Sequence, residues 1–475
     1  MIRNGKKKAI SCALVAAMSV GLAACGTTSY DFKVSYDGIK TGDVSSKVSV
    51  HDPSILKADG EYYIFGSHMS AAKSSDLLNW EKVADGYSKK NPVYGQIYDV
   101  ADKAFAYSGS KNSLIKTDDK QVHVWAPDVI YNETTGLYYM YYCTTSTWNA
   151  SNLCYGTSTT PEGPYEWQGA LIYSGFNRKT ISGTDVLDYV DEDYAYKNYI
   201  KGAQYNYEDY PNAIDPTVFY DADGRMWMVY GSWSGGIFLL EIDKTTGLVI
   251  HPEADEANNV DPYYGKRLLG GGHISIEGPY IMYDEASGYY YLFVSYGALT
   301  SNGGYQVRVF RSKTVDGDYV DMNGKYPEKS AQHQNFGLKL TGNYKLPSLE
   351  KAYMATGHNS AFVDDDGRMY LVYHTRFNDN GEGHSPRVHQ MLVNEDGWPC
   401  ELPYQTQGET VNKDGYDADD IIGRYYVINQ GTAIDSKIAN PVILYLEKNG
   451  KVKGEKSEGT WECKDGSYYM NITID

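Results

Sequence analysis

The chain alternates short apolar stretches with polar turns in a way that predicts strands and not helices. Five segments share one order: a polar residue opens a short apolar strand, a turn dipeptide ending in glycine follows about eight to eleven residues later, and an aromatic strand returns. The turns are Asp59-Gly60, Thr135-Gly136, Asp223-Gly224, Ser287-Gly288 and Asp366-Gly367. Glycine supplies the positive φ angle that a tight hairpin needs. Because the apolar positions alternate with period two or run continuously, the pattern predicts an all-β fold.

The repeat predicts how the strands are arranged. Its opening polar residues are Asp52, Asp128, Asp215, Glu277 and His358. Five repeats, each with room for two more strands after its hairpin, fit a five-bladed β-propeller over residues 46–395. In that fold every innermost strand begins at the same end of the central channel, so these five residues are expected to approach one axis. A β-sandwich is the alternative, and it gives no reason for the same polar position five times.

Two other regions stand apart from the repeat. Residues 171–210 are rich in Tyr and Asp and indicate a surface insertion, which could form a wall of a cleft. From about Asn394 the pattern changes to strands at 423–428, 442–446 and 467–472, separated by polar turns. Residues 396–475 are therefore predicted to form a small all-β domain, barrel-like or sandwich-like.

The N-terminus has the features of an export signal. Arg3 and three lysines precede an apolar stretch over 9–20, and Leu22-Ala23-Ala24-Cys25 follows. Small residues before a cysteine resemble a bacterial lipobox. We expect a signal peptide at 1–24, lipidation of Cys25, a linker over 25–45, and an exported protein anchored by lipid at the cell surface. A plain signal peptide with an incidental cysteine is the alternative.

The amino-acid composition limits the classes of ligand that the protein can bind. The formal net charge is −18 and the pI is about 5.0, so nucleic acid or an anionic polymer would meet repulsion of like charge. A neutral ligand fits better. The chain has 47 tyrosines, whose rings can pack in sheets or stack on sugars. We expect a monomer whose only contact with a membrane is the lipid anchor.

Several other chemistries find no support in the residues. After Cys12 and Cys25, the cysteines at 143, 154, 400 and 463 form no metal motif, and whether Cys143 pairs with Cys154 stays open. The chain contains neither a Gly-x-Ser-x-Gly elbow nor a His-Glu-x-x-His motif.

Three of the axial residues match the needs of glycoside hydrolysis. That reaction uses one carboxylate to activate water and one carboxylic acid to protonate the leaving oxygen. A third carboxylate nearby raises the pKa of the acid through repulsion of like charge. Asp52, Asp215 and Glu277 fit these needs in number. An isolated Asp-Pro is usually a turn, but a recurring position in a repeat favours function.

The sequences around these residues resemble glycoside hydrolase family 43. The motifs are Val50-His51-Asp52-Pro53-Ser54-Ile55, Ala213-Ile214-Asp215-Pro216-Thr217, Ser275-Ile276-Glu277-Gly278-Pro279, Val124-Trp125-Ala126-Pro127-Asp128 and Thr356-Gly357-His358-Asn359-Ser360. The resemblance implies a five-bladed propeller and an inverting mechanism. It also implies Asp52 as general base, Glu277 as general acid, and Asp215 as the residue that tunes and orients the acid.

Within that family the chain most resembles two-domain extracellular endo-α-1,5-L-arabinanases, which implies arabinan as the substrate. It further implies that His358 and water hold a calcium ion on the axis. Because calcium prefers oxygen ligands, the alternatives are a protonated His358, a bound chloride, or a histidine that is only hydrogen-bonded in the channel. Trp125 and Phe219 are candidate stacking platforms, and Arg376 offers a fork for sugar hydroxyls or an axial carboxylate. An exo-acting β-xylosidase or α-L-arabinofuranosidase and a non-catalytic glycan-binding propeller remain as alternatives.

Overall fold

The computed structural model describes residues 29–37, 46–86, 90–93, 104–108, 123–145, 150–329, 332–464 and 466–475. The predicted signal peptide and Cys25 lie outside the described residues. Within the predicted linker, residues 29–37 lie against the C-terminal sheet, where the rings of Tyr30 and Tyr445 are 5.1 Å apart. Among the helices of the described part, none is long and apolar enough to span a membrane.

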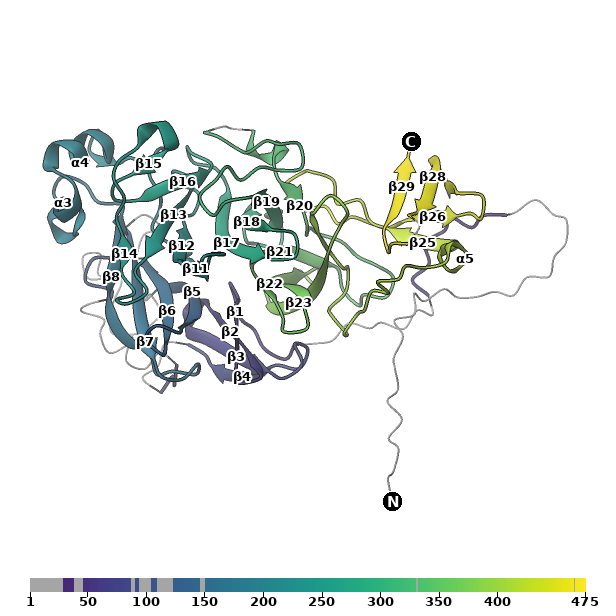
Figure 1. The fold of residues 1–475 in the computed structure, drawn as a ribbon, viewed down its shortest axis with the longest axis horizontal. Coiled ribbons are helices and arrows are strands. Elements are labelled where there is room, and N and C mark those ends of the chain that lie inside the picture. The colour runs from purple at the N-terminus through teal and green to yellow at the C-terminus, as the bar shows by residue number, and fades with distance from the viewer. Residues whose placement is uncertain are drawn as a thin grey trace, which may run out of the picture.

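Five antiparallel sheets follow one another along the chain (Figure 1). The first contains β1 (Ser54–Ala58), β2 (Glu61–Gly66), β3 (Ser70–Ser74) and β4 (Glu81–Ala84). The second contains β5 (His123–Asn132), β6 (Leu137–Thr145), β7 (Ser151–Ser158) and β8 (Glu166–Ser174). The third contains β11 (Thr217–Tyr220), β12 (Met226–Tyr230), β13 (Ile237–Ile242), β14 (Val249–Ile250), β15 (Val260–Asp261) and β16 (Gly265–Leu269).

The fourth sheet contains β17 (Ile276–Asp284), β18 (Tyr289–Tyr296), β19 (Gln306–Ser312) and β20 (Leu338–Lys339). The fifth contains β21 (Tyr353–Val363), β22 (Met369–Phe377), β23 (His384–Val393) and β24 (Pro399–Glu401). Since β24 pairs with β23, the fifth sheet extends to Glu401, past the predicted boundary at 395. These sheets and the C-terminal one make the described chain predominantly β, as the pattern of apolar positions predicts.

The first strands of the five sheets contact one another in a closed ring. β1 contacts β5, β5 contacts β11, β11 contacts β17, β17 contacts β21, and β21 returns to β1. Side chains join these strands: Asp128 accepts hydrogen bonds from the Ser54 hydroxyl and, at 2.6 Å, from the Val218 amide. The Ile55 amide donates to Ser360 Oγ at 3.1 Å and so joins β1 to β21. The first and last sheets are therefore held together directly.

Each inner strand has a residue in the left-handed region at its opening end: just before β1 and β11, and inside β5, β17 and β21 where the pairing register shifts. The φ angles are +55° at Asp52, +42° at Ala126, +57° at Asp215, +55° at Gly278 and +48° at His358. A residue other than glycine pays about 1–3 kcal/mol for such a conformation, which is found mostly at functional sites. These five residues share one position in the repeat. Glu277 stands one residue before that position, and Asp128 two residues after it.

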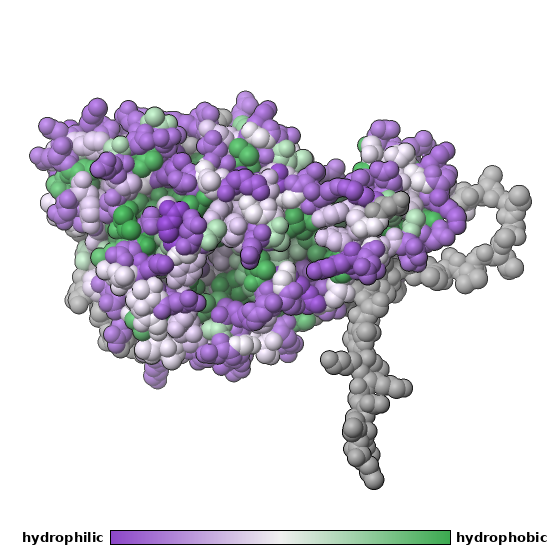
Figure 2. Space-filling view, in the orientation of Figure 1, coloured by the Kyte–Doolittle hydropathy of each residue, from purple (hydrophilic) through white to green (hydrophobic). Residues whose placement is uncertain are grey.

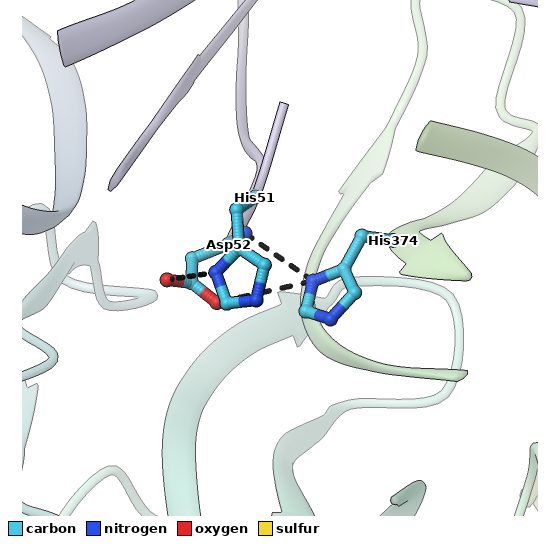
Figure 3. A group of neighbouring side chains, drawn as sticks. All are labelled: His51, Asp52 and His374. Atoms are coloured by element: carbon cyan, nitrogen blue, oxygen red, sulfur yellow. Dashed lines mark hydrogen bonds and ion pairs between the residues drawn. The ribbon is translucent and has the colours of Figure 1, made fainter. Parts of the chain in front are cut away.

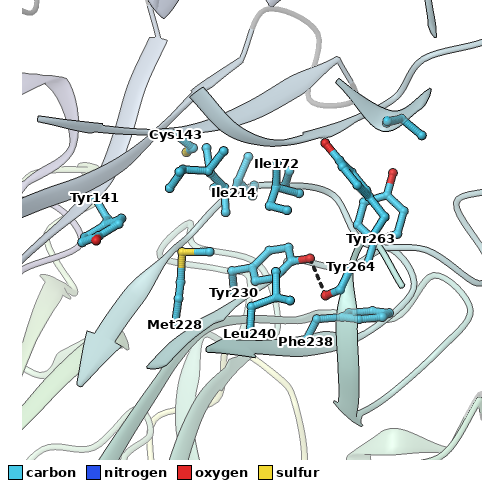
Figure 4. Packing of buried hydrophobic residues seen from close by; sticks show 14 of the residues in the cluster. Tyr141, Cys143, Ile172, Ile214, Met228, Tyr230, Phe238, Leu240, Tyr263 and Tyr264 are labelled. Atoms are coloured by element: carbon cyan, nitrogen blue, oxygen red, sulfur yellow. Dashed lines mark hydrogen bonds between the residues drawn. The ribbon is translucent and has the colours of Figure 1, made fainter. Parts of the chain in front are cut away.

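Hydrophobic cores lie between neighbouring sheets, and several buried tyrosines donate hydrogen bonds to backbone carbonyls in them. In the largest, between the second and third sheets, Tyr230 donates to the Tyr264 carbonyl at 2.8 Å, and Tyr141 donates to the Gly247 carbonyl at 2.9 Å (Figure 4). Most of the aromatic surface therefore stabilises the fold.

The region 171–210 extends this core. After β8 it forms η3 (Ile181–Gly183), α3 (Val186–Tyr189), α4 (Glu192–Asn198), β9 (Ile200–Lys201) and β10 (Gln204–Tyr205). Tyr199 and Tyr205 are buried in the same core as Tyr230. None of residues 171–210 lines the pocket of the candidate active site described below. The expectation that this region forms a wall of that cleft is therefore wrong.

Cys143 and Cys154 are both buried and unpaired. Cys143 lies opposite Leu153 across β6 and β7, so Cys154 is one residue further along and points to the other face. The two thiols accordingly belong to different cores.

A five-stranded sheet forms the C-terminal part (Figure 1). It contains β25 (Gly423–Val427), β26 (Val442–Leu446), β27 (Lys451–Gly454), β28 (Glu458–Cys463) and β29 (Met470–Ile474), preceded by α5 (Ala418–Ile421). Its small core is built around Trp461 and Leu444.

The connection between β25 and β26 is joined to the fourth sheet. Arg308, which is 0 % exposed, donates to the Thr432 carbonyl, and Gln306 Nε2 donates to the Ala433 carbonyl at 3.0 Å. Arg308 also donates to the carbonyls of Gln334 and Phe336, at 2.7 and 2.8 Å. A buried guanidinium needs such partners, so the C-terminal part completes the fourth sheet.

Candidate active site

A pocket of about 770 Å³ opens where the inner strands begin. Six of the seven residues predicted for catalysis, metal binding or substrate binding line it: Asp52, Trp125, Asp215, Glu277, His358 and Arg376. The molecular surface in Figure 2 is mostly hydrophilic, and hydrophobic residues show mainly where it is hollowed between sheets. The repeat therefore gathers one chemical centre from the ends of separate sheets.

Asp52 is buried, with 8 % of its surface exposed, and it is surrounded by donors. Its carboxylate lies 3.0 Å from His358 Nδ1 and 2.7 Å from His51 Nδ1, and it accepts a hydrogen bond from the Ser67 hydroxyl in η1 (Ser67–Met69). Burial alone would raise the pKa of Asp52, but the charges of His358 and His51 outweigh it and hold the pKa well below 3.8. Asp52 is thus a carboxylate at any ordinary pH.

A third histidine fixes the backbone of Asp52 (Figure 3). His374 Nδ1 accepts a hydrogen bond from the Asp52 amide at 3.3 Å, and the rings of His374 and His51 stack with centroids 4.2 Å apart. His51, Asp52 and His374 are close enough together to hold a metal ion. However, the lone pair of His374 Nδ1 is used by the Asp52 amide, so the group serves better as a shell around the carboxylate.

Glu277 is held at both carboxylate oxygens. Tyr305 donates to Oε1 at 2.7 Å, and Trp233 Nε1 donates to Oε2 at 2.6 Å. The pKa of Glu277 is raised, chiefly by burial, with Asp52 adding to the rise while Tyr305, His358 and Trp233 oppose it. This carboxyl group keeps its proton to a higher pH than a free glutamate does.

The carboxyl group of Asp215 interacts electrostatically with both Glu277 and Asp52. Its Oδ2 accepts a hydrogen bond from the Gly278 amide at 3.2 Å, directly after Glu277. Burial raises the pKa of Asp215 to about 7; His358 opposes the rise, and Glu277 and Asp52 add to it. Two neighbouring carboxyl groups that both resist ionisation keep a proton near neutral pH.

His358 supplies positive charge at the centre. Burial lowers its pKa, but the Asp52 carboxylate outweighs burial, and the pKa rises to about 9. Its amide donates to Ser295 Oγ at 2.7 Å, and its ring lies against Gly278, where a Cβ atom would be 3.1 Å from Cγ and Nδ1. A side chain at 278 would therefore press on the imidazole, which would have to shift by a few tenths of an ångström.

Two residues expected near the centre have other places. Asp128 joins β1 to β11 and does not line the pocket, because it follows the strained residue of its repeat by two positions. Phe219 packs in the core between the third and fourth sheets, with 8 % of its surface exposed. The prediction that Phe219 stacks on a sugar is wrong, since it lies two residues inside β11 and away from the strand's opening end.

Trp125 and Arg376 do line the pocket, with different roles. Trp125 is partly exposed there, beside the ring of His123 at 5.0 Å. Arg376 is 5 % exposed, and its Nε donates to the Leu299 carbonyl at 2.7 Å and pairs with Glu382 at 3.2 Å. Arg376 therefore holds two connections together at the pocket.

The sequence reasoning missed Trp233, Tyr305, His51, His374 and His384, of which Tyr305 and His374 support the centre from behind the pocket lining. Trp233 is itself in the left-handed region, with φ +57°. The one available signal was His51, which stands directly before Asp52. The other four residues come from connections and strands outside the recurring motif, so the repeat does not mark them.

Comparisons with known proteins agree with this geometry. Residues 44–208 and 191–399 match the model of Glycosyl hydrolases family 43, and residues 403–475 match a C-terminal lipocalin-like domain. The chain is 39 % identical to an extracellular endo-α-(1→5)-L-arabinanase of Thermotoga petrophila, over 90 % of this chain and 84 % of that one. It is 36 % identical to extracellular endo-α-(1→5)-L-arabinanase 2 of Bacillus subtilis, over 91 % and 86 %. The crystal structure of the T. petrophila endo-1,5-α-L-arabinanase superposes with a TM-score of 0.76 at 37 % identity, covering 92 % of this chain and 90 % of that one.

Proposed function

The chain belongs to glycoside hydrolase family 43, and we propose that it is an inverting hydrolase of internal α-1,5-L-arabinofuranosidic bonds in arabinan. The observation that carries the proposal is the pocket in which Asp52, ionised, and Glu277, with a raised pKa, occur together. The relatives at 36 and 39 % identity are named for this activity. The acidic chain also suits a neutral polysaccharide.

In the proposed mechanism Asp52 is the general base. A carboxylate that activates water must stay ionised, and the charges of His358 and His51 provide that. Ser67 and the two histidines also fix the direction of its oxygens, since each donates to or pairs with the carboxylate. The base accepts a proton from water as the water attacks the anomeric carbon from the face opposite the leaving group.

Glu277 is the general acid. It donates its proton to the leaving oxygen, so it must hold that proton near the working pH. Asp215 helps through repulsion of like charge and through its hydrogen bond from the amide next to Glu277. Trp233 and Tyr305 orient the carboxyl group, and Trp125 offers a face for a sugar ring.

We also propose that the pocket holds a calcium ion at the axis of the ring of sheets. His358 Nδ1 is paired with Asp52, so a metal ion would bind at Nε2 and would first have to displace the proton that the charged imidazole carries there. The ionised Asp52 and the other carboxyl groups of the pocket favour a cation. This donor set fits an ion held by one nitrogen and water, and not a cage of protein oxygens. When bound, the ion would supply fixed positive charge beside the carboxylates.

Fold and location complete the proposal. We take the ring of five sheets as a five-bladed propeller, supported by the contacts among the inner strands. We take the residues after Glu401 as its companion domain, in place of the predicted 396–475, because β24 belongs to the fifth sheet. Export with a lipid anchor at Cys25 and a monomeric state rest on the sequence and on the extracellular relatives.

The test is the product profile on debranched linear arabinan, followed by NMR. The parent enzyme should release oligosaccharides whose new reducing ends have inverted configuration, and release of monomer alone would contradict endo action. Asp52→Ala and Glu277→Ala should each lower turnover by about 10²–10⁴-fold while folding survives. Asp59→Asn, at the far end of the same hairpin as Asp52, is the control and should leave turnover unchanged. Near-parental rates in either alanine variant would refute the mechanism.

A further inference from the structure

Two connections meet at one side of the catalytic pocket. The connection between β18 and β19 contributes Ala298, Leu299 and Thr300 to the lining, and the connection between β22 and β23 contributes Glu382. The fourth and fifth sheets carry these connections, and the acid Glu277 begins the fourth sheet. These four residues, which form one side of the pocket, have no role in the proposed catalytic mechanism.

Glu382 joins the two connections. Its carboxylate accepts hydrogen bonds from the Ser301 amide at 3.0 Å and from the Ser301 hydroxyl at 2.7 Å. Arg376 completes the junction by pairing with Glu382 and donating to the carbonyls of Leu299 and Glu382. Because Arg376 is 5 % exposed, its charge is largely removed from water and depends on these partners.

The tip of the first connection, residues 298–301, is compact in itself. The Gly303 amide donates to the Thr300 carbonyl at 2.8 Å, and the Ala298 amide donates to the Gly303 carbonyl at 3.0 Å. A Cβ atom at Gly303 would lie 2.0 Å from the Ala298 carbonyl oxygen, so glycine is required for this turn. The tip is thus presented to the pocket as a shaped surface.

The tip lies outside the hydrophobic cores of the described residues. Leu299 belongs to none of the hydrophobic clusters found among the described residues, although it is half-buried, and Ala298 and Thr300 are exposed. An apolar side chain held at the edge of a pocket by an ion-paired junction offers surface to the C–H face of a sugar. A hydroxyl beside it can exchange hydrogen bonds with the ring.

We propose that residues 298–301, held by Glu382, form a wall of the arabinan cleft and that Glu382 determines specificity by positioning this wall. The inference rests on the proposed function. The wall contacts sugar units on one side of the scissile bond, so its position influences how tightly a chain is bound and where along its length it is cut. Glu382 acts through the wall and not on the reacting atoms.

The experiment compares three variants on linear arabinan: Glu382→Ala, Glu382→Gln, and the control Asp379→Ala. Asp379 lies in the same connection and pairs with Lys351 at 2.8 Å, but it does not line the pocket. Glu382→Ala should raise KM about fivefold or more, as loss of a net hydrogen-bond contribution implies, with kcat within about twofold. Its oligosaccharide lengths at equal conversion should differ from those of the parent.

Glu382→Gln, which keeps an acceptor for Ser301 but loses the ion pair, should fall between the parent and Glu382→Ala, and Asp379→Ala should match the parent. Unchanged KM and product lengths in Glu382→Ala would overturn the inference. So would a shift of its pH–kcat profile, because the effect would then pass through Glu277. A parent that releases no oligosaccharides would overturn the proposed function itself, and the inference with it.

Discussion

The hydroxyl group of Tyr305 offers a direct test of how the acid is tuned. Tyr305 is 1 % exposed and donates to Glu277 Oε1 at 2.7 Å. Its ring is fixed by Gly357, where a Cβ atom would lie 2.3 Å from Cδ1. Tyr305→Phe therefore removes one donor and leaves the ring in place.

The sign and the size of the effect follow from that bond. A donor favours the ionised carboxylate, so its loss raises the pKa of Glu277 further. A hydrogen bond to a charged group contributes about 1.5–3 kcal/mol, and part of it survives in the protonated acid. Since one pKa unit equals 1.36 kcal/mol, the rise should be about one unit. An acid is active while protonated, so the basic limb of the profile should move to higher pH by that amount.

The assay is the initial rate of oligosaccharide release from linear arabinan across the pH range where the enzyme is folded. Tyr296→Phe is the matched control: Tyr296 is equally buried near the same strand, and its hydroxyl has no hydrogen-bond partner within the described structure. Its profile should superimpose on that of the parent. A Tyr305→Phe profile that also superimposes would refute the assignment of Glu277 as the acid tuned by this bond.

Three further predictions concern the scaffold and the axis. Burial raises the pKa of Asp128 to about 7, above its value in the unfolded chain, so the parent loses stability as pH rises from about 4 to 7. Asparagine does not titrate, so the melting temperature of Asp128→Asn minus that of the parent should increase over this pH range. A difference that does not change with pH would contradict this prediction. Gly278→Ala should lower kcat about tenfold, because its Cβ atom meets the His358 ring and alanine is strained at φ +55°; parental kcat would show that the ring position is unimportant. Chelation should lower activity in the parent, with recovery on adding calcium, and indifference to the chelator would count against the ion.

The fold was predictable where local chemistry repeats. The Asp59-Gly60 turn, with φ of +53° and +80°, forms the hairpin that its sequence indicates, with Ala58 paired to Glu61. In the region 171–210, the sequence does not indicate which face the tyrosines cover, and the structure places Tyr199 and Tyr205 in a core. Whether a tyrosine is a binding surface or a core residue depends on the neighbouring sheet, and that is a long-range property.

The residues of the site also divide into those that the sequence pattern predicts and those that it does not. Asp52, Asp215 and His358 share one strained position in the repeat, which the sequence marks by a proline after the first two. Trp233 and Tyr305 reach Glu277 from the connections before β13 and β19, and no spacing links them to it. Phe219 follows a catalytic motif closely, but the alternation of side chains along β11 turns its ring into the core, so proximity in the sequence does not predict contact with a substrate.

The partners of Arg308 bear on the order in which the protein matures. Its guanidinium is bonded to carbonyls from residues 334 and 336 and from residue 432, which is encoded more than a hundred residues later. While the chain is emerging, the fourth sheet carries a cation whose final partner has not yet been made. Proteolysis of nascent or truncated chains should therefore cut this sheet readily until the last tenth of the sequence arrives, and the finished chain should acquire resistance in a single late step.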